Sequence, residues 1–157
     1  MRIRNQQGEV LYDTGRSNRG ELALDSIDLS GCNLEAADLG GFGMCDANLE
    51  GANLRGANLY WAILFRTNFR NCDLRDADLC GANLEETNLE GADLRGANLG
   101  PDSLGGSTRL QGARLFGARL SEAILTSAEY DNATVFPAGF DPQAHGMRES
   151  FSKKKNT

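Results

Sequence analysis

Residues 46–60 read DANLE GANLR GANLY, three consecutive blocks of five residues that share one pattern. Each block holds a small residue, then Asp or Asn, then Leu, then two variable positions. A period of five fits neither a helix, which repeats at about 3.6 residues, nor a half-buried strand, which repeats at about two. The chain is therefore interpreted as an internal repeat before any single helix or strand is considered.

The same frame continues well beyond these blocks. Its central position holds Leu in almost every block over 24–104, with Met44 and Phe69 as exceptions. One extra residue enters within 105–108, and the frame resumes over 110–140. Two positions before the centre stands a small residue, most often Ala, with Leu22, Ile27, Phe42 and Asp102 as exceptions. We expect the central residue and its small companion to be buried, and the other positions of each block to face water.

One large and one small inward position in each block suit a narrow tube whose wall is the backbone. Each coil would satisfy its N–H and C=O groups by bonding to the coils above and below it, as in other β-solenoids. Burying one Leu contributes about 1.5–3 kcal/mol, whereas ordering five backbone residues costs roughly 5–10 kcal/mol. A single block therefore cannot hold itself, and many coils have to form together.

Blocks of the form A(D/N)LxG, such as Ala52–Gly56, resemble those of the pentapeptide-repeat family, and the resemblance covers residues 22–140. It implies an all-β fold, a right-handed quadrilateral β-helix with about four blocks per coil and about six coils. The ending over 130–142 is similar to that of many cyanobacterial members. With four blocks per coil, residues twenty apart stack on one another, so the sides can be written down from the sequence.

Three segments are expected. Residues 1–20 lie outside the frame and read as strand, turn and strand. We expect this hairpin to be an N-terminal cap, with Ile3, Val10 and Tyr12 covering a solenoid end that would otherwise be an unpaired β edge. The β-helix is expected over 21–142, closed by 130–142 and interrupted by a one-residue insertion near 105–108, and a disordered tail over 143–157.

Charge and the N-terminal sequence restrict the classes of partner. The net charge is −6 with a sequence pI near 4.8, which disfavours direct binding to nucleic acid or to an anionic membrane. The first residues, MRIRNQQGEV, have no apolar core of the kind found in signal peptides, and no apolar run is long enough to cross a bilayer. We expect a cytoplasmic protein.

No catalytic site, cofactor site or metal site is predicted. The only histidine, His145, lies beyond the last block, and the cysteines show no metal-binding spacing. Cys32 and Cys72 occupy small inward positions two coils apart, too far from each other for a disulfide. The Asp and Glu residues are placed on open sides without a cleft that could shift their pKa. The chain is therefore predicted not to be an enzyme.

One corner departs from the polar pattern. In the frame, Tyr60, Trp61, Ile63 and Phe65 point outward around this corner, and Trp61 is the only tryptophan of the chain. Contiguous exposed apolar surface marks interaction sites, and Trp and Tyr are favoured anchors at interfaces. These residues are candidates for binding a partner or for self-association. The alternative is that the corner packs under the N-terminal segment or merely tolerates aromatic residues.

A column of arginines is the second candidate surface. Arg55, Arg75 and Arg95 are twenty residues apart and therefore stack, beside a column of Asn and Asp. They could recognise an acidic partner. The alternative is that the Asn/Asp column hydrogen-bonds the turns, and that the arginine stems lie over it with their charge nearly cancelled.

Two functions remain open. The first is a non-enzymatic scaffold or protein-binding module for an unknown partner. The resemblance implies the second, because some members of the family mimic duplex DNA and act on DNA gyrase or topoisomerase. The arginine column argues against mimicry, as does a belt of Arg109, Arg114 and Arg119. A centre dominated by Leu also differs from the Phe that is more frequent in the mimics.

Overall fold

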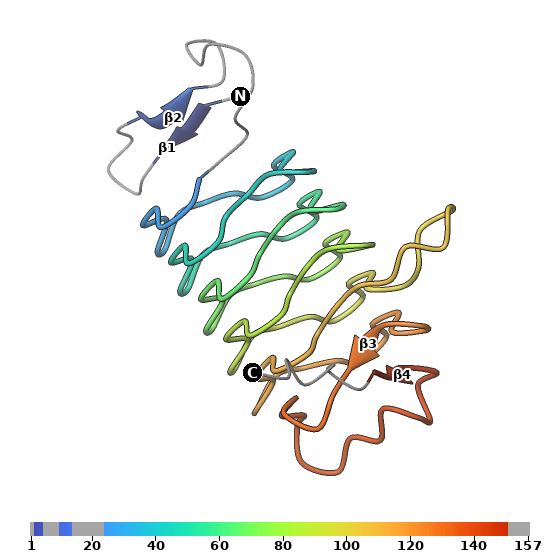
Figure 1. The fold of residues 1–157 in the computed structure, drawn as a ribbon. Helices are drawn as coiled ribbons and strands as arrows, with labels where there is room; N and C mark the ends of the chain where they lie inside the picture. The colour runs from blue at the N-terminus through green and yellow to red at the C-terminus, as the bar shows by residue number, and fades with distance from the viewer. Residues whose placement is uncertain (1, 5–9, 14–23, 151–157) are drawn as a thin grey trace, which may run out of the picture.

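The computed structural model describes residues 2–4, 10–13 and 24–150, and its described core is a stack of coils along one axis (Figure 1). Strands β1 (Arg2–Arg4) and β2 (Val10–Asp13) pair antiparallel. Strands β3 (Glu129–Tyr130) and β4 (Arg148–Glu149) pair parallel at the other end. For Ile3, Val10 and Tyr12 the structure describes the strand pairing but not the side chains, so the cap stays a prediction.

Between these strands, the coils are joined by single parallel bridges. Asn33 bridges Asn53, which bridges Asp73, which bridges Asp93, and each step is twenty residues. A coil of twenty residues is four blocks, as the resemblance implies. The backbone bonds repeat at each step: Leu34 N–H donates to Asn53 O at 2.7 Å, and Asn53 N–H donates to Cys32 O at 2.9 Å.

The interior contains the residues that the frame predicts for it. Every central residue over 24–99 is buried, and so are most of the small residues two positions earlier. Where a small position is polar, its side chain bonds to a carbonyl: Thr67 Oγ1 donates to Met44 O at 2.6 Å, and Cys72 Sγ donates to Leu49 O at 2.7 Å. These bonds offset the cost of burying a polar group.

The corners explain the glycine that ends many blocks. The second residue of each turn is left-handed, with φ of 66° at Gly51, 58° at Asp76 and 55° at Trp61. Glycine takes this conformation without steric cost, whereas other residues pay for it in strain. Where a corner residue is not glycine, the backbone hydrogen bonds between coils on both sides of the corner keep it in this conformation.

The insertion is larger than the sequence frame predicts. Asn83 bridges Arg109 and Asn98 bridges Ile124, each pair twenty-six residues apart, so this coil carries six extra residues rather than one. The extra chain forms an insertion loop, residues 100–107, that projects from the tube (Figure 1, yellow). Leu104, expected inside, is 89% exposed on this loop. One extra residue and six extra residues leave the same phase in a five-residue count, so the sequence could not distinguish them.

A second shift follows near the C-terminal end. Arg114 bridges Val135, twenty-one residues later, and Thr134 occupies the small position with Oγ1 donating to Leu110 O at 2.9 Å. Val135 is consequently exposed, and Phe136 packs against the core. The expected placement, with Val135 inside and Phe136 outside, is wrong because an extra residue enters the turn at Asp131, whose Oδ1 accepts from two following N–H groups.

The sequence-based prediction places the start of the disordered tail, at residue 143, too early in the chain. Residues 143–150 are part of the fold: β4 pairs with β3, and Met147 is buried. Residues 151–157 lie outside the described part. Among the described residues, no helix is long and apolar enough to span a bilayer.

Candidate protein-binding surface

The structure brings three of the four aromatic-corner candidates together. Tyr60, Trp61 and Ile63 are 38%, 49% and 48% exposed, on a corner and the side that follows it. Phe65 lies at the far edge of that side, half-buried, with the Arg66 guanidinium 4.7 Å from its ring centroid. Phe65 is therefore covered by its neighbour rather than available beside Trp61.

The insertion loop is fastened to this corner by Asp102. Trp61 Nε1 donates to Asp102 Oδ2 at 2.8 Å, and Tyr60 Oη donates to the same oxygen at 3.4 Å. The other carboxylate oxygen accepts from the N–H of Gly106 at 2.6 Å and of Leu104 at 2.9 Å. The Gly106 N–H, followed by the Trp61 indole, holds the pKa of Asp102 below its usual value.

Two glycines allow the indole to lie between the coil and the loop. A Cβ atom at Gly81 would come within 2.7 Å of Trp61 Nε1, and one at Gly106 within 2.5 Å of Trp61 Cζ2. Neither separation is compatible with an alanine at that position unless the indole moves. The corner therefore packs under the insertion loop, not merely against solvent.

The loop and the coil together enclose a hollow of about 480 Å³, here called the corner groove. Its apolar wall is formed by Trp61 and Ile63, and its polar end by Arg109 and Glu129. Arg109 Nη1 lies 3.2 Å from Glu85 Oε1, so its charge is already paired. Glu129 accepts a hydrogen bond from Gln111 Nε2 at 3.1 Å and has no ion pair among the described residues.

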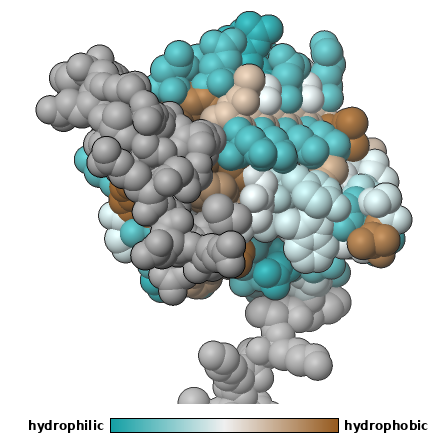
Figure 2. Space-filling model, turned by 90° about the horizontal axis from the view of Figure 1, so that it is seen from above, coloured by the Kyte–Doolittle hydropathy of each residue, from teal (hydrophilic) through white to brown (hydrophobic). Residues whose placement is uncertain are grey.

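Outside this corner, the exposed large apolar residues among those described are Leu104, Phe116, Ile124 and Val135. Seen from above the view of Figure 1, the described part of that face is mainly hydrophilic, with apolar residues in separate patches (Figure 2). Single exposed apolar residues are normal, whereas a group that lines a hollow is informative. The corner groove is such a group.

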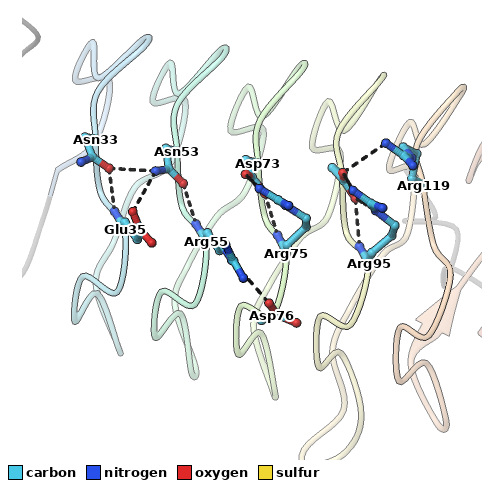
Figure 3. Close-up of polar contacts among 10 residues, drawn as sticks. Asn33, Glu35, Asn53, Arg55, Asp73, Arg75, Asp76, Arg95 and Arg119 are labelled. Atoms are coloured by element: carbon cyan, nitrogen blue, oxygen red, sulfur yellow. Dashed lines mark hydrogen bonds and ion pairs between the residues drawn. The ribbon is translucent and has the colours of Figure 1, made fainter.

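The arginine column is neutralised by the protein's own carboxylates (Figure 3). Arg75 binds Asp73 through two bonds, Nε to Oδ1 at 2.8 Å and Nη2 to Oδ2 at 2.5 Å. Arg95 binds Asp93 in the same way, at 2.8 and 2.7 Å. In both pairs the arginine's hydrogen bonds lower the pKa of the carboxyl group.

The remaining arginines of the column and the belt also lie near carboxylates. Arg55 Nε lies 3.6 Å from Asp76 Oδ2 on the next coil. The belt arginines pair with carboxylates of the preceding coil: Arg109 with Glu85, Arg114 with Glu90, and Arg119 with Asp93. The column and the belt therefore present a mixed, charge-balanced surface rather than a free basic stripe.

Beneath the arginines lies the Asn/Asp ladder. Asn53 Nδ2 donates to Asn33 Oδ1 at 3.0 Å, while Asn53 Oδ1 accepts the N–H of Arg55 at 3.1 Å. Asn53 thus joins one coil to the next and also fixes its own turn, whereas Asp73 and Asp93 accept the N–H groups of Arg75 and Arg95 in their own turns at 3.2 and 3.3 Å. These contacts agree with the structural alternative that the sequence left open for the column.

Two of the buried thiols, those of Cys72 and Cys80, are held in the protonated form. Burial raises the pKa of Cys72 to about 12 and that of Cys80 to about 11, so both remain protonated at neutral pH. Among residues 24–150, no three His, Cys, Asp or Glu side chains are placed to hold a metal ion.

The repeat and the coiled structure of this chain are shared with known proteins. A family model for pentapeptide repeats matches residues 27–71 and 62–100, with eight copies of the repeat. The solved pentapeptide repeat protein Rfr23 from the cyanobacterium Cyanothece 51142 is 31% identical, over 73% of this chain and 91% of Rfr23, with a TM-score of 0.60. The chain belongs to the pentapeptide-repeat family. Pentapeptide-repeat proteins form right-handed quadrilateral β-helices, and this is its fold class.

Other pentapeptide-repeat proteins are also similar. HetL from Nostoc sp. PCC 7120, described as involved in heterocyst differentiation regulation, is 33% identical over 80% of this chain and 58% of HetL, with a TM-score of 0.40. The protein alr5209 from Nostoc PCC 7120 is 31% identical over 83% of this chain and 86% of its own, with a TM-score of 0.37. No curated protein matched the chain.

Sequence reasoning missed the loop side of the corner groove. Asp102 and Gly106 join Trp61 across about forty residues, and Arg109 and Glu129 come from later coils. The available signal was Asp102, a charged residue at a position that is otherwise small or apolar, shortly before two consecutive glycines at 105–106. Such a departure from the repeat indicates a local structure with its own contacts.

Proposed function

We propose that this pentapeptide-repeat protein, a β-helix of about six coils, is a non-enzymatic scaffold that binds a partner protein in the corner groove. One observation carries the proposal: Trp61 and Ile63, each about half exposed, line the hollow of about 480 Å³ beside a loop that departs from the repeat. Exposed aromatic and aliphatic side chains around a concavity are anchors for binding. The hydrogen-bonded ladder keeps the groove preformed, which lowers the entropy lost on binding.

The groove also indicates the chemistry of the partner. The space between Trp61 and Ile63 suits an apolar side chain. At the polar end Arg109 is paired with Glu85, and within the described part of the chain no cation pairs with the carboxylate of Glu129. A cationic residue next to the apolar one would complement it.

Affinity capture with matched variants tests this proposal. Ile63→Lys and Trp61→Ala change the groove, whereas Val135→Lys and Phe116→Ala change residues that are exposed elsewhere, at 45% and 65%. A partner that is lost with both groove variants and retained with both controls supports the groove. A partner lost equally with Val135→Lys, or retained by both groove variants, contradicts it.

The alternative, a DNA mimic acting on DNA gyrase or topoisomerase, is favoured by the net charge of −6. The paired arginines of the column and belt weigh against it, because a duplex presents two continuous rows of negative charge. We expect titrated protein to leave gyrase supercoiling unchanged. Inhibition or protection of gyrase at stoichiometric concentration would favour mimicry instead.

We further propose a cytoplasmic protein that does not bind nucleic acid or membranes directly. The support is its acidic charge and four free cysteines, which suit a reducing compartment. Self-association through the corner groove is the competing use of the same surface, and sedimentation of Ile63→Lys beside the native chain separates the two.

A further inference from the structure

Within the described residues, which end at Ser150, the C-terminal end of the tube is covered on two of its four sides. Val135 bridges Arg114, and β4 pairs with β3, so residues 131–150 run beneath those two sides. Arg119 and Ile124, on the other two sides, bridge only to the preceding coil. The closure expected from 130–142 is therefore incomplete.

Along the uncovered sides, a row of backbone groups lacks the partners that every earlier coil supplies. One coil higher, Leu94 N–H donates to Arg119 O at 2.9 Å and Leu99 N–H donates to Ile124 O at 2.8 Å. Among the described residues, no partner exists for the corresponding groups of residues 117–126, here called the open edge: the N–H groups of Gly117, Leu120, Glu122 and Leu125 and the C=O groups of Ala118 and Ala123. This alternation of donors and acceptors is that of an unpaired β edge.

A second hollow adjoins the open edge. Its volume is about 290 Å³, and Ala118 and Leu120 line it from the last full coil. Phe140 and His145 face them from residues 131–150, stacked with ring centroids 4.4 Å apart. Ala118, Leu120 and Phe140 give the hollow an apolar lining, so it suits one apolar side chain.

We propose that the open edge binds an extended segment of a partner protein by strand addition, with one apolar side chain of that segment in the end hollow. The segment would run parallel to 117–126, because all neighbouring rungs of the ladder are parallel. Its carbonyls would accept from Leu120 and Leu125, and its N–H groups would donate to Ala118 and Ala123.

The size of the open edge decides the kind of occupant. A stable interface between folded proteins uses roughly 20–30 residues on each side. The open edge runs only over 117–126, flanked by the step that residues 131–150 form. This area suits a short extended segment rather than a second copy of the chain. The open edge and the corner groove lie on different sides of the tube and share no residue, so either binding site can exist without the other.

The test uses a peptide with the sequence of Ala92–Gly100, capped at both ends, as the probe. In the fold this segment lies directly above 118–126, so it has the side-chain pattern of a neighbouring coil. Amide hydrogen exchange is followed by NMR on the full chain. We expect saturating peptide to slow exchange at Leu120 and Leu125 by at least about tenfold, and to leave Leu110 and Leu115, which already have partners, unchanged.

The control is the same peptide with N-methyl groups on the residues that correspond to Asp93 and Asn98. It loses the two N–H groups that would bond to Ala118 and Ala123, and we expect no protection from it. Equal protection by the control peptide, or no protection by either peptide, overturns the proposal. Protection that appears without peptide and rises with protein concentration, together with a dimer in sedimentation, also overturns it and assigns the edge to a second copy.

Discussion

At the scale of single residues, the position within the five-residue repeat sets the direction of a side chain. Whether that side chain is buried also depends on whether its block belongs to a regular coil or to the insertion loop. Leu54 and Leu104 occupy the same central position of the five-residue frame, yet Leu54 is fully buried and Leu104 is 89% exposed. At the corners, the left-handed conformation makes glycine the least strained residue. A corner glycine acquires a second role only where a neighbouring side chain lies against it, as Trp61 does at Gly81.

Truncation of these two leucines should change the free energy of unfolding by very different amounts. We expect Leu54→Ala to lower the free energy of unfolding by about 2–5 kcal/mol, because it leaves a cavity in a tube that cannot collapse around it. Leu104→Ala should change it by less than about 0.5 kcal/mol, since the side chain is in water in both states. Urea unfolding measures both, and equal losses would contradict the looped-out insertion.

Two corner glycines form a matched pair. Both Gly81 and Gly51 have positive φ, 68° and 66°, but only Gly81 has the indole of Trp61 against it. Gly51→Ala should cost about 1 kcal/mol of strain and leave the tryptophan unchanged. Gly81→Ala should also push Trp61 toward solvent, seen as a red shift of its emission. An unchanged emission spectrum in Gly81→Ala would contradict the contact.

At the scale of elements, the insertion loop is the part that makes a groove out of a flat side. Among the described residues, the loop side chain that hydrogen-bonds to the coil is Asp102, whose carboxylate accepts from Trp61 and Tyr60. The loop residues Leu104 and Gly106 bond to the same carboxylate. One ionised group therefore sets both the shape of the loop and its position on the corner.

The anchoring of the loop should depend on pH in a defined direction. The pKa of Asp102 is lowered in the folded state, so its contribution is fully present above the usual Asp pKa of about 3.9 and is lost as the pH falls through the lower folded value. We expect the Trp61 emission to stay constant from about pH 7 to pH 4 and to change only below that. In Asp102→Asn the transition should disappear. A transition near neutral pH would contradict the assignment.

At the scale of the whole molecule, stability is shared along the ladder. Each coil satisfies its backbone only through its neighbours, so the interior opens when many rungs open together. The inward thiols lie on this axis: Cys72 is buried and bonds through Sγ to Leu49 O, whereas Cys45 is half-buried at a corner. The ends and the insertion loop are the places where the molecule departs from uniform stacking, and both candidate binding surfaces lie there.

Thiol labelling reports this cooperativity. At pH 8 we expect Cys45 to react first, because Cys72, with a pKa of about 12, is both protonated and enclosed. Labelling of Cys72 should require opening of the ladder, and should therefore accelerate with urea in parallel with global unfolding. Mass spectrometry of digested, labelled protein gives the rate at each site. Rapid labelling of Cys72 in the native state would contradict a closed interior.

The amino-acid sequence by itself determined which side chains of residues 24–99 point into the tube and which column each outward residue joins, because a coil of four equal blocks repeats its geometry at every step. It also placed the aromatic corner and the charge-balanced arginines. Only the tertiary structure decided that the insertion holds six residues, that Asp102 seats the loop on Trp61, and that the final coil covers two sides. The physical reason is that a five-residue count records position within a block and nothing about the block's place along the axis. Contacts between residues far apart in the chain depend on that place.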